Sequence, residues 1–584
     1  MGAMRGIWVL LLLGAALSLA AGPSGCGDDD DDDNDTASDD DTADDDTADD
    51  DTSDDDTGDD DTADDDDDDD PDWYRRAVFM EIFPRSYYDS DGDGIGDLSG
   101  LTQKLDYVAD LGVKGIWITP FYPTPFFDSG YDVADYVGVN PEYGDLADVD
   151  ALLARAHELG LKVLIDGVFN HTSQAHAWFQ AARSSPTDPH RDWYIWTDDA
   201  ENPPFECANI GEAGGGDDRW NYDEVAGQYY YNQFREEMPD LNIQNEDVQE
   251  AIKGVLRFWL DRGVDGFRLD VAHLYVQDEN YCAHHPETHA FLQEMRDVLD
   301  EYDDRAMVGE ILGSTEEVAG YFGPSDNELH MAFHFNAAYG LYAALYTGNA
   351  KTIVSVIDGM AAADKAGGSP AIITGNHDFF REAGLLFGDE SRMRLAAAAL
   401  LTMPGTPFLY YGQEIGMANG EDVVVDSRDA ARTPMQWDNT PGAGFTDGEP
   451  WIDLAPNWAT NNVAAMDGDP SSLLAHYKHL IEIREGSPLA GGDYRPVATE
   501  NKSLYAFFRT NEAGAYLVVL NFNKDGQSES LDLNSSPWAD KAGEVAELYS
   551  GLAATELTTE NRDAYPVDVP ARGVAILTLS PLGD

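Results

Sequence analysis

Short apolar runs recur along the chain at intervals that leave room for a helix between most of them. Amphipathic stretches with helical spacing fill two of these intervals, at 148–159 and 248–262. Strand-like runs separated by helices are typical of parallel βαβ units. The pattern predicts an α/β fold, a closed (β/α)8 TIM barrel, with strands at 78–83, 115–119, 162–165, 264–269, 306–308, 331–335, 371–374 and 407–411.

Two regions depart from this alternation. Between the third and fourth runs, residues 170–240 are rich in Gly, Pro, Trp and Tyr, which predicts a lobe inserted after strand 3, over the barrel mouth. After residue 487, short runs that alternate apolar and polar residues predict a C-terminal antiparallel β domain. The predicted domains are the barrel in two parts, 72–169 and 241–487, the lobe 170–240, and the β domain 488–584.

The first residues are typical of a targeting segment. An arginine precedes an apolar run at 7–21 that is too short to span a bilayer comfortably, so residues 1–26 are predicted to be a secretory signal. Small residues before Cys26 resemble a bacterial lipobox, in which that cysteine carries the lipid. Pro23 stands where an aliphatic residue is usual, so ordinary cleavage a few residues earlier is the alternative. We therefore expect export, to the cell surface or outer membrane through a lipid at Cys26, or otherwise by secretion.

An aspartate tract follows the signal. Between residues 28 and 70 no apolar residue is larger than alanine, so nothing there offsets the entropy cost of ordering the chain. Like charges also repel one another and extend it. Residues 27–71 are predicted to be a disordered tether, with calcium binding by the tract as the alternative.

The acidity extends beyond the tether. The whole chain has 113 acidic and 34 basic residues, a net charge of −79. Without the tract's 29 aspartates and Arg5 of the signal segment, 84 acids and 33 bases leave −51. Such a surface repels nucleic acid and anionic membranes, so we expect neither as a partner. Three cysteines exclude a disulfide scaffold. If Cys26 is lipidated, Cys207 and Cys282 are the only possible pair.

Three strand-like runs each deliver one acid at the carboxyl end. They lead into Asp270, Glu310 and the sequence Asn376-His377-Asp378. A parallel barrel brings such positions together, which predicts an active site at its mouth. Period-two geometry puts Arg268 on the same side as Asp270, so its guanidinium is predicted to hold that carboxylate ionised.

Two further groups of residues carry side chains suited to binding an ion or a ligand. Residues 89–97 alternate aspartate with small turn formers, a pattern that can wrap a hard cation with side-chain oxygens and a backbone carbonyl. The alternative is an Asp/Gly turn without an ion, and no EF-hand glutamate follows. Tyr131 and His171, each beside carboxylates after the second and third runs, fit a polyhydroxylated ligand.

Taken together, these stretches resemble the alpha-amylase superfamily of retaining glycosidases, glycoside hydrolase family 13. The matching motifs span most of the chain in family order. They are GIWITP (115–120), DGVFNH (166–171), MPDLN (238–242), GFRLD (266–270), VGEI (308–311), GNHD (375–378) and ARTPMQWD (431–438).

The resemblance implies a role for each acid. Asp270 corresponds to the nucleophile, Glu310 to the general acid/base, and Asp378 to the acid that binds sugar hydroxyls and stabilises the transition state. Retention needs one ionised and one protonated carboxyl about 5–5.5 Å apart, and a raised pKa is expected for Glu310 at the end of an apolar strand.

The resemblance also implies substrate and metal ligands. His171 and His377 resemble the family's hydroxyl-binding pair, and Tyr131 its stacking ring. The metal loop of oligo-1,6-glucosidase-like members is matched by Asp89, Asp91, Asp93, the Ile95 carbonyl and Asp97, which implies a structural Ca²⁺.

Exo action is implied by Asp128 and Arg432, which fall where exo-acting members have an acid–arginine pair closing the innermost sugar pocket. The lysine that endo-amylases often carry after the nucleophile is absent. Two residues leave the linkage open: Met238 is typical of neopullulanase-like members, whereas Val271 is associated with α-1,6 cleavage.

These observations predict an exported hydrolase of malto- or isomalto-oligosaccharides or α-glucans, alpha-glucosidase-like in action. An endo-acting amylase or neopullulanase and a trehalose-synthase-like transglycosylase or isomerase are alternatives on the same residues. An inactive carbohydrate-binding protein is the alternative of a different class.

Overall fold

The computed structural model describes residues 72–207, 219–364, 368–421, 424, 427–550 and 553–579. The predicted signal segment, Cys26 and the aspartate tether lie outside the described residues. None of the helices within the described ranges is both long enough and apolar enough to cross a membrane.

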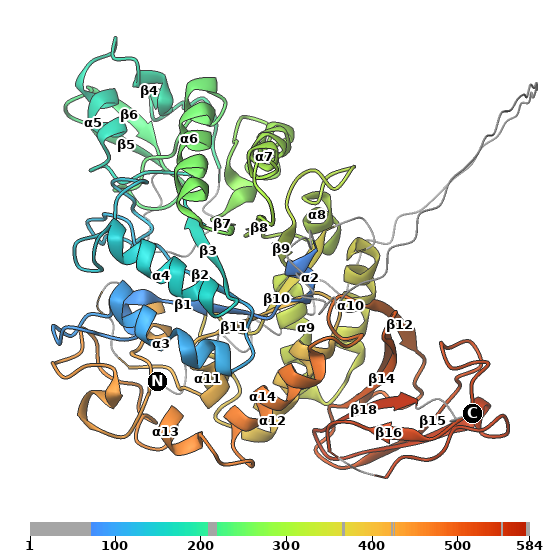
Figure 1. The fold of residues 1–584 in the computed structure, drawn as a ribbon. Helices are drawn as coiled ribbons and strands as arrows, with labels where there is room; N and C mark the ends of the chain where they lie inside the picture. The colour runs from blue at the N-terminus through green and yellow to red at the C-terminus, as the bar shows by residue number, and fades with distance from the viewer. Residues whose placement is uncertain are drawn as a thin grey trace, which may run out of the picture.

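Eight parallel strands close into a barrel, which confirms the predicted fold (Figure 1). They are β1 (Phe79–Ile82), β2 (Gly115–Ile118), β3 (Lys162–Gly167), β7 (Gly266–Leu269), β8 (Ala306–Gly309), β9 (Met331–Phe333), β10 (Ser369–Ile373) and β11 (Thr406–Tyr410). Neighbours around the barrel follow the order β1-β11-β10-β9-β8-β7-β3-β2. Each predicted strand overlaps an observed one.

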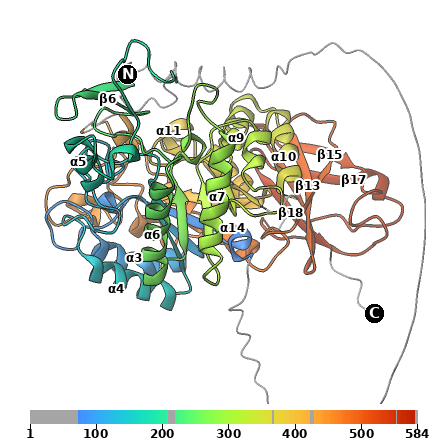
Figure 2. The ribbon, with the colours of Figure 1, turned by 90° about the horizontal axis from the view of Figure 1, so that it is seen from above.

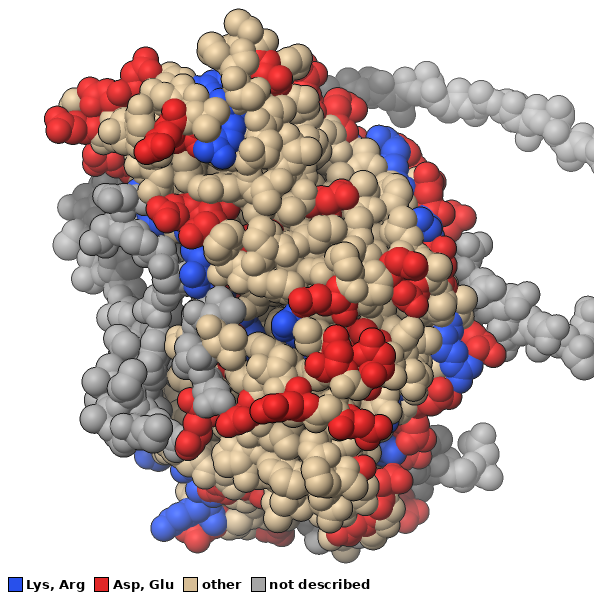
Figure 3. All heavy atoms as spheres, turned by 90° about the vertical axis from the view of Figure 1, so that its left-hand side faces the viewer, with Lys and Arg blue, Asp and Glu red and all other residues tan. Residues whose placement is uncertain are grey.

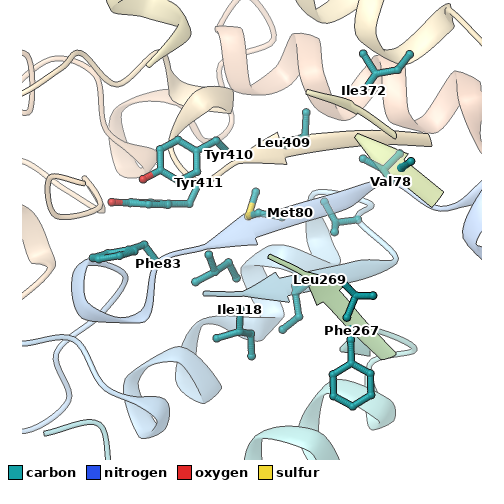
Figure 4. Packing of buried hydrophobic residues seen from close by; sticks show 14 of the residues in the cluster. Val78, Met80, Phe83, Ile118, Phe267, Leu269, Ile372, Leu409, Tyr410 and Tyr411 are labelled. Carbon is teal, nitrogen blue, oxygen red and sulfur yellow. The ribbon is translucent and has the colours of Figure 1, made fainter. Parts of the chain in front are cut away.

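Alternation along each strand divides the buried side chains into two layers. Phe79 and Phe408, on adjacent strands, stack with ring centroids 4.6 Å apart in a cluster to which every barrel strand except β7 contributes, and this cluster fills the interior. The next residues along, Met80 and Leu409, belong to the large cluster between the strands and the surrounding helices, part of which Figure 4 shows. Glu81 shares the inward parity of Phe79, so a carboxylate enters the interior.

Helices follow most strands and cover the outside of the barrel. The longer ones are α3 (Leu98–Asp110), α4 (Leu146–Glu158), α6 (Glu246–Arg262), α7 (Pro286–Leu299), α9 (Phe335–Thr347), α10 (Lys351–Asp364), α12 (Glu390–Thr402) and α14 (Leu473–Arg484). The shorter ones are α2 (Trp73–Arg76), α5 (Ala177–Ser184), α8 (Thr315–Gly320), α11 (Glu382–Leu385) and α13 (Val463–Met466). Single 3-10 turns are η1 (Pro84–Ser86), η2 (Arg191–Trp193), η3 (Ala272–Leu274), η4 (Gln413–Ile415), η5 (Ser427–Ala431), η6 (Pro441–Gly444) and η7 (Arg562–Ala564).

Between β3 and α6 the chain forms a small three-stranded antiparallel sheet, in the order β4-β6-β5. Its strands are β4 (Trp196–Thr197), β5 (Trp220–Asp223) and β6 (Gln228–Tyr231). A disulfide joins Cys207 of this lobe to Cys282, in the segment after β7, with their Cα atoms 5.4 Å apart. The lobe is thereby linked covalently to the part of the barrel that follows Asp270.

The last part of the chain is antiparallel, as predicted. A five-stranded sheet has the order β12-β13-β14-β18-β16, and β15 pairs with β17. The strands are β12 (Asp493–Val497), β13 (Leu504–Asn511), β14 (Gly514–Asn521), β15 (Gln527–Leu531), β16 (Val545–Glu547), β17 (Tyr565–Val569) and β18 (Val574–Leu579). This β domain and the lobe lie at opposite ends of the barrel (Figure 2). Acidic side chains outnumber basic ones on the face in Figure 3.

Candidate active site

The three predicted acids lie at one end of the barrel because each follows a parallel strand. Asp270 comes directly after β7, Glu310 directly after β8, and Asp378 lies in the loop after β10. Their side chains retain 9, 12 and 26% of their exposure, so each is largely enclosed while still open to solvent.

Arg268, on β7, joins two of these acids through one guanidinium. Its Nη1 lies 2.6 Å from Asp270 Oδ1 and its Nη2 lies 2.6 Å from Glu310 Oε2. The same Nη1 donates to Asp166 Oδ1 at 2.8 Å. Arg268 is 1% exposed, so its planar group fixes the relative placement of the two carboxyls inside the barrel mouth.

The protonation of this pair differs from the prediction. Burial raises the pKa of Glu310, as expected, and Arg268 only opposes the shift. Burial also raises the pKa of Asp270 well above its usual value, with help from Glu310 and Asp166, and against Arg268. Arg268 lowers the pKa of Asp270 in the predicted direction, but burial outweighs it, so the guanidinium does not suffice to keep this carboxyl ionised. One cation facing three carboxylates favours a state in which the Asp270–Glu310 pair shares a proton, giving one carboxylate and one carboxylic acid.

Asp378 is held ionised by cations. Its carboxylate lies 3.1 Å from both His377 Nε2 and Arg428 Nη1, and 3.3 Å from Arg432 Nη2. Burial favours the neutral acid, but these groups together hold the pKa of Asp378 well below its usual range. Burial likewise opposes the charge on His377, yet Asp378 and Glu81 raise its pKa to about 9.

Tyr131 and His171 both line the same region. The Tyr131 hydroxyl donates to Asp166 Oδ2 at 3.0 Å, and its ring stacks on His377 with centroids 5.2 Å apart. The ring is 5% exposed. His171 Nε2 lies 3.2 Å from the Tyr131 carbonyl oxygen, and burial lowers the pKa of His171 to about 4, so this imidazole is neutral.

The predicted ion pair between Asp128 and Arg432 does not form. Asp128 instead accepts a hydrogen bond from Arg428, the residue four positions earlier in η5. The Arg432 guanidinium has other partners: Nη1 donates to Ser129 Oγ at 2.8 Å, and Nε donates to the His377 carbonyl at 3.0 Å. An acid–arginine pair is thus present at this edge of the site, with a different arginine.

The arrangement matches known proteins. Residues 81–491 match the family model for the alpha-amylase catalytic domain. The chain belongs to the alpha-amylase family.

Relatives in this family have several activities. The chain is 35% identical over 516 residues to an oligo-1,6-glucosidase of Halalkalibacterium halodurans, covering 77% of this chain and 90% of the relative. It is 37% identical over 521 residues to the trehalose synthase/amylase TreS of Mycolicibacterium smegmatis, covering 80% and 87%. The crystal structure of the trehalulose synthase MutB of Pseudomonas mesoacidophila superimposes with a TM-score of 0.77 at 32% identity, covering 87% of this chain and 99% of MutB.

Three residues of this alpha-amylase family site were not predicted. Asp166 is fully buried and accepts from Arg268, Tyr131 and, at 2.9 Å, from Trp117 Nε1. Glu81 accepts from His377 Nδ1 at 2.6 Å. Arg428 bridges the loops that carry Asp128 and Asp378. The sequence held one signal for Asp166 and Glu81: each is an acid within an apolar strand, at a position where period-two alternation directs the side chain into the barrel.

The aspartate-rich loop lies between η1 and α3. Oxygen atoms of Asp89, Asp91 and Asp97 lie within 4.8 Å of one another. None of these three carboxylates forms an ion pair with a basic side chain in the described part of the chain, so their mutual repulsion has no such offset. Asp93 lies outside the group, and its Oδ1 accepts from the Ile95 backbone N–H at 2.8 Å.

Proposed function

We propose that this chain is a retaining glycoside hydrolase that cleaves α-glucosidic bonds in starch-derived glucans or oligosaccharides. The observation that carries the proposal is the single guanidinium of Arg268 contacting both Asp270 and Glu310 at 2.6 Å, with ionised Asp378 beside them. Oligo-1,6-glucosidase relatives at 35% identity support the substrate class.

The chemistry uses the shared proton. Asp270, as carboxylate, attacks the anomeric carbon and forms a glycosyl ester, while the bond to the leaving oxygen breaks and Glu310 gives that oxygen its proton. Water then attacks the same carbon, Glu310 takes its proton, and the ester bond breaks to release Asp270. Asp378 keeps its charge throughout and stabilises the positive charge that develops on the sugar ring.

Asp270→Asn tests this assignment, because an amide cannot form the glycosyl ester. We expect at least about a hundredfold loss of kcat on maltose and isomaltose, with the exposed Asp303→Asn as the matched control. Proton NMR of the wild-type reaction should show the α-anomer first. Early β-anomer would overturn retention, and a rate within tenfold of wild type would overturn the nucleophile.

We also propose exo action, because Arg428, in the loop after β11, contacts both Asp128 and Asp378 and so connects the loops after β2, β10 and β11. A glucan chain cannot run past such a barrier, so cleavage starts at the non-reducing end. Arg428→Ala removes the barrier, whereas Arg394→Ala, in an exposed ion pair with Glu390, serves as the control.

Wild type should release mostly glucose from maltoheptaose and lower starch viscosity slowly. Arg428→Ala should release a larger share of maltose and maltotriose. Rapid loss of viscosity with the wild-type enzyme would favour the endo-acting amylase or neopullulanase alternative instead. Rates on maltose and isomaltose separate α-1,4 from α-1,6 preference.

Isomerisation is the second candidate, favoured by the 37% identity to TreS. Hydrolysis of maltose doubles the number of reducing ends, whereas conversion to trehalose removes them. Chromatography of the maltose products separates the two, and an absence of any turnover would favour an inactive carbohydrate-binding protein.

We propose that Asp89, Asp91 and Asp97 hold a structural Ca²⁺, whose hard oxygen ligands they supply. The ion would offset repulsion among three carboxylates and tie the loop to the start of α3. Calcium should then raise the melting temperature of wild type but not of Asp91→Asn. Asp93→Asn decides whether that residue, outside the group, joins the site. If calcium does not change the melting temperature of wild type, the loop is an Asp/Gly turn that binds no ion.

We propose that the chain is exported and carries a lipid at Cys26. The disulfide supports export, since such bonds persist in oxidising compartments. Palmitate labelling and fractionation of cells test this: wild type should be labelled and membrane-bound, and Cys26→Ser unlabelled and released. An unlabelled wild type found in the medium would indicate secretion instead.

A further inference from the structure

The turn after Asp270 holds Glu310 at more than one point. Val271 adopts a left-handed backbone with φ 38°, which is uncommon for a β-branched residue. In this conformation its N–H lies 3.2 Å from Glu310 Oε2. Strained backbone at such a position persists only when its surroundings stabilise it.

His273, two residues further on in η3, contacts the backbone of the same residue. Its Nδ1 lies 3.2 Å from the Glu310 carbonyl oxygen. A carbonyl only accepts, so Nδ1 is the donor. The ring is 1% exposed, and burial lowers the pKa of His273 to about 3, so it stays neutral while the pair of acids reacts.

The remaining backbone bond of Glu310 completes the arrangement. Its N–H donates to the Leu269 carbonyl at 2.9 Å, through the parallel pairing of β7 and β8. His273 is in turn fixed by the His284 N–H, which donates to its carbonyl at 2.8 Å. Both peptide groups of Glu310 are therefore bonded to the segment that carries Asp270, one through a strand and one through an imidazole.

We propose that His273 is a positioning residue, which sets the distance between Glu310 and Asp270 by holding the Glu310 carbonyl. The inference rests on the proposed function, in which Glu310 protonates the leaving oxygen. No part of that chemistry uses the imidazole itself. Its effect is on placement, and a displacement of about 1 Å in a catalytic group can cost roughly a hundredfold in rate.

Substitutions distinguish this role from simple packing. The amide nitrogen of His273→Asn can occupy the place of Nδ1, whereas that of His273→Gln corresponds to Nε2, and His273→Ala has no donor. The control is His334→Ala, another histidine that is 2% exposed, whose Nε2 lies 2.9 Å from Thr315 Oγ1. That control should change stability without selecting between substrates.

The assay compares maltose with a dinitrophenyl α-glucoside, whose leaving group needs little protonation. His273→Ala and His273→Gln should lose about ten- to a hundredfold in kcat on maltose and less than about threefold on the aryl glucoside. His273→Asn should recover most of the maltose rate, and KM should change little. If His273→Ala does not fold, the Asn and Gln variants still decide the matter.

Equal losses on the two substrates, or equal behaviour of Asn and Gln, would overturn the positioning role. Glu310→Gln in the same assay reports on the proposed function separately. If Glu310→Gln loses both activities equally, the acid assignment itself fails and the role of His273 fails with it. If Glu310→Gln separates the two substrates and His273→Ala does not, only the positioning role is overturned.

Discussion

Glu81 on β1 supports a charge that lies almost three hundred residues away in the sequence. Its Oε1 accepts from both Nδ1 and the backbone N–H of His377, at 2.6 and 3.1 Å, and both side chains are nearly inaccessible. Glu81→Gln keeps the shape of the side chain and removes its charge. Among the described residues, Asp378 is then the one carboxylate left in contact with the imidazole to favour its protonated form.

The magnitude follows from linkage. Burial lowers the pKa of His377, but Asp378 and Glu81 raise it from 6.5 to about 9. Between pH 6.5 and about 9 the folded protein therefore binds a proton that the unfolded protein lacks. A pKa difference of about 2.5 at 1.36 kcal/mol per pKa unit contributes about 3 kcal/mol to the free energy of unfolding. This stability is fully present below pH 6.5 and is lost as pH rises through about 9.

Urea unfolding at several pH values from 6 to 9.5 measures the effect. The free energy of unfolding of wild type should fall relative to Glu81→Gln by up to about 1.4 kcal/mol per pH unit between 6.5 and 9. Glu328→Gln is a matched control, since that buried carboxylate contacts His289 Nδ1 at 2.7 Å between α7 and the segment before β9. Parallel curves for wild type and Glu81→Gln would refute the reasoning.

Three further predictions follow from other features. Glu310→Gln should cost far more on maltose than on an aryl glucoside with a good leaving group, and equal losses in kcat would contradict its role as the acid. Burial raises the pKa of Glu382 from 4.5 to about 8, so the stability that its protonated form gives is lost as pH rises through 8. In urea unfolding from pH 4.5 to 8, the free energy of unfolding of Glu382→Gln should therefore gain up to about 1.4 kcal/mol per pH unit over that of wild type. The body's net charge of −51 should make the melting temperature rise from low to molar salt, because salt screens repulsion over about 10 Å at 0.1 M, and a flat calorimetric curve would contradict this.

Patterns that depend on one strand were readable from the sequence. All eight barrel strands could be placed because each is a short apolar run, and Asp270 and Glu310 could be placed because they end such runs. Period-two alternation also put Arg268 beside Asp270. The protonation of Asp270 beside Arg268 was not predictable, since it depends on how many other carboxylates the closed barrel brings to the same guanidinium.

Contacts between distant loops were not readable in the same way. Arg428 and Arg432 stand four residues apart, and nothing in the sequence says which of them reaches Asp128. The answer depends on how η5 turns over the barrel mouth. Glu81 and His377 meet only because β1 and the loop after β10 lie close together at the mouth of the closed barrel.

The bond between Cys207 and Cys282 makes the order and place of synthesis relevant to the active site. Its partners are 75 residues apart, and closing a loop of that length removes about 4 kcal/mol of chain entropy from the unfolded state in the loop-closure model. A ribosome releases the lobe cysteine first, so the covalent closure waits until β7 and the nucleophile have also emerged. The same polypeptide made in a reducing cytosol is a different molecule, two hydrogens heavier. Its lobe and barrel mouth lack this covalent link and are held together by packing and by hydrogen bonds such as that from the Tyr231 hydroxyl to Gln277 Oε1 at 2.6 Å.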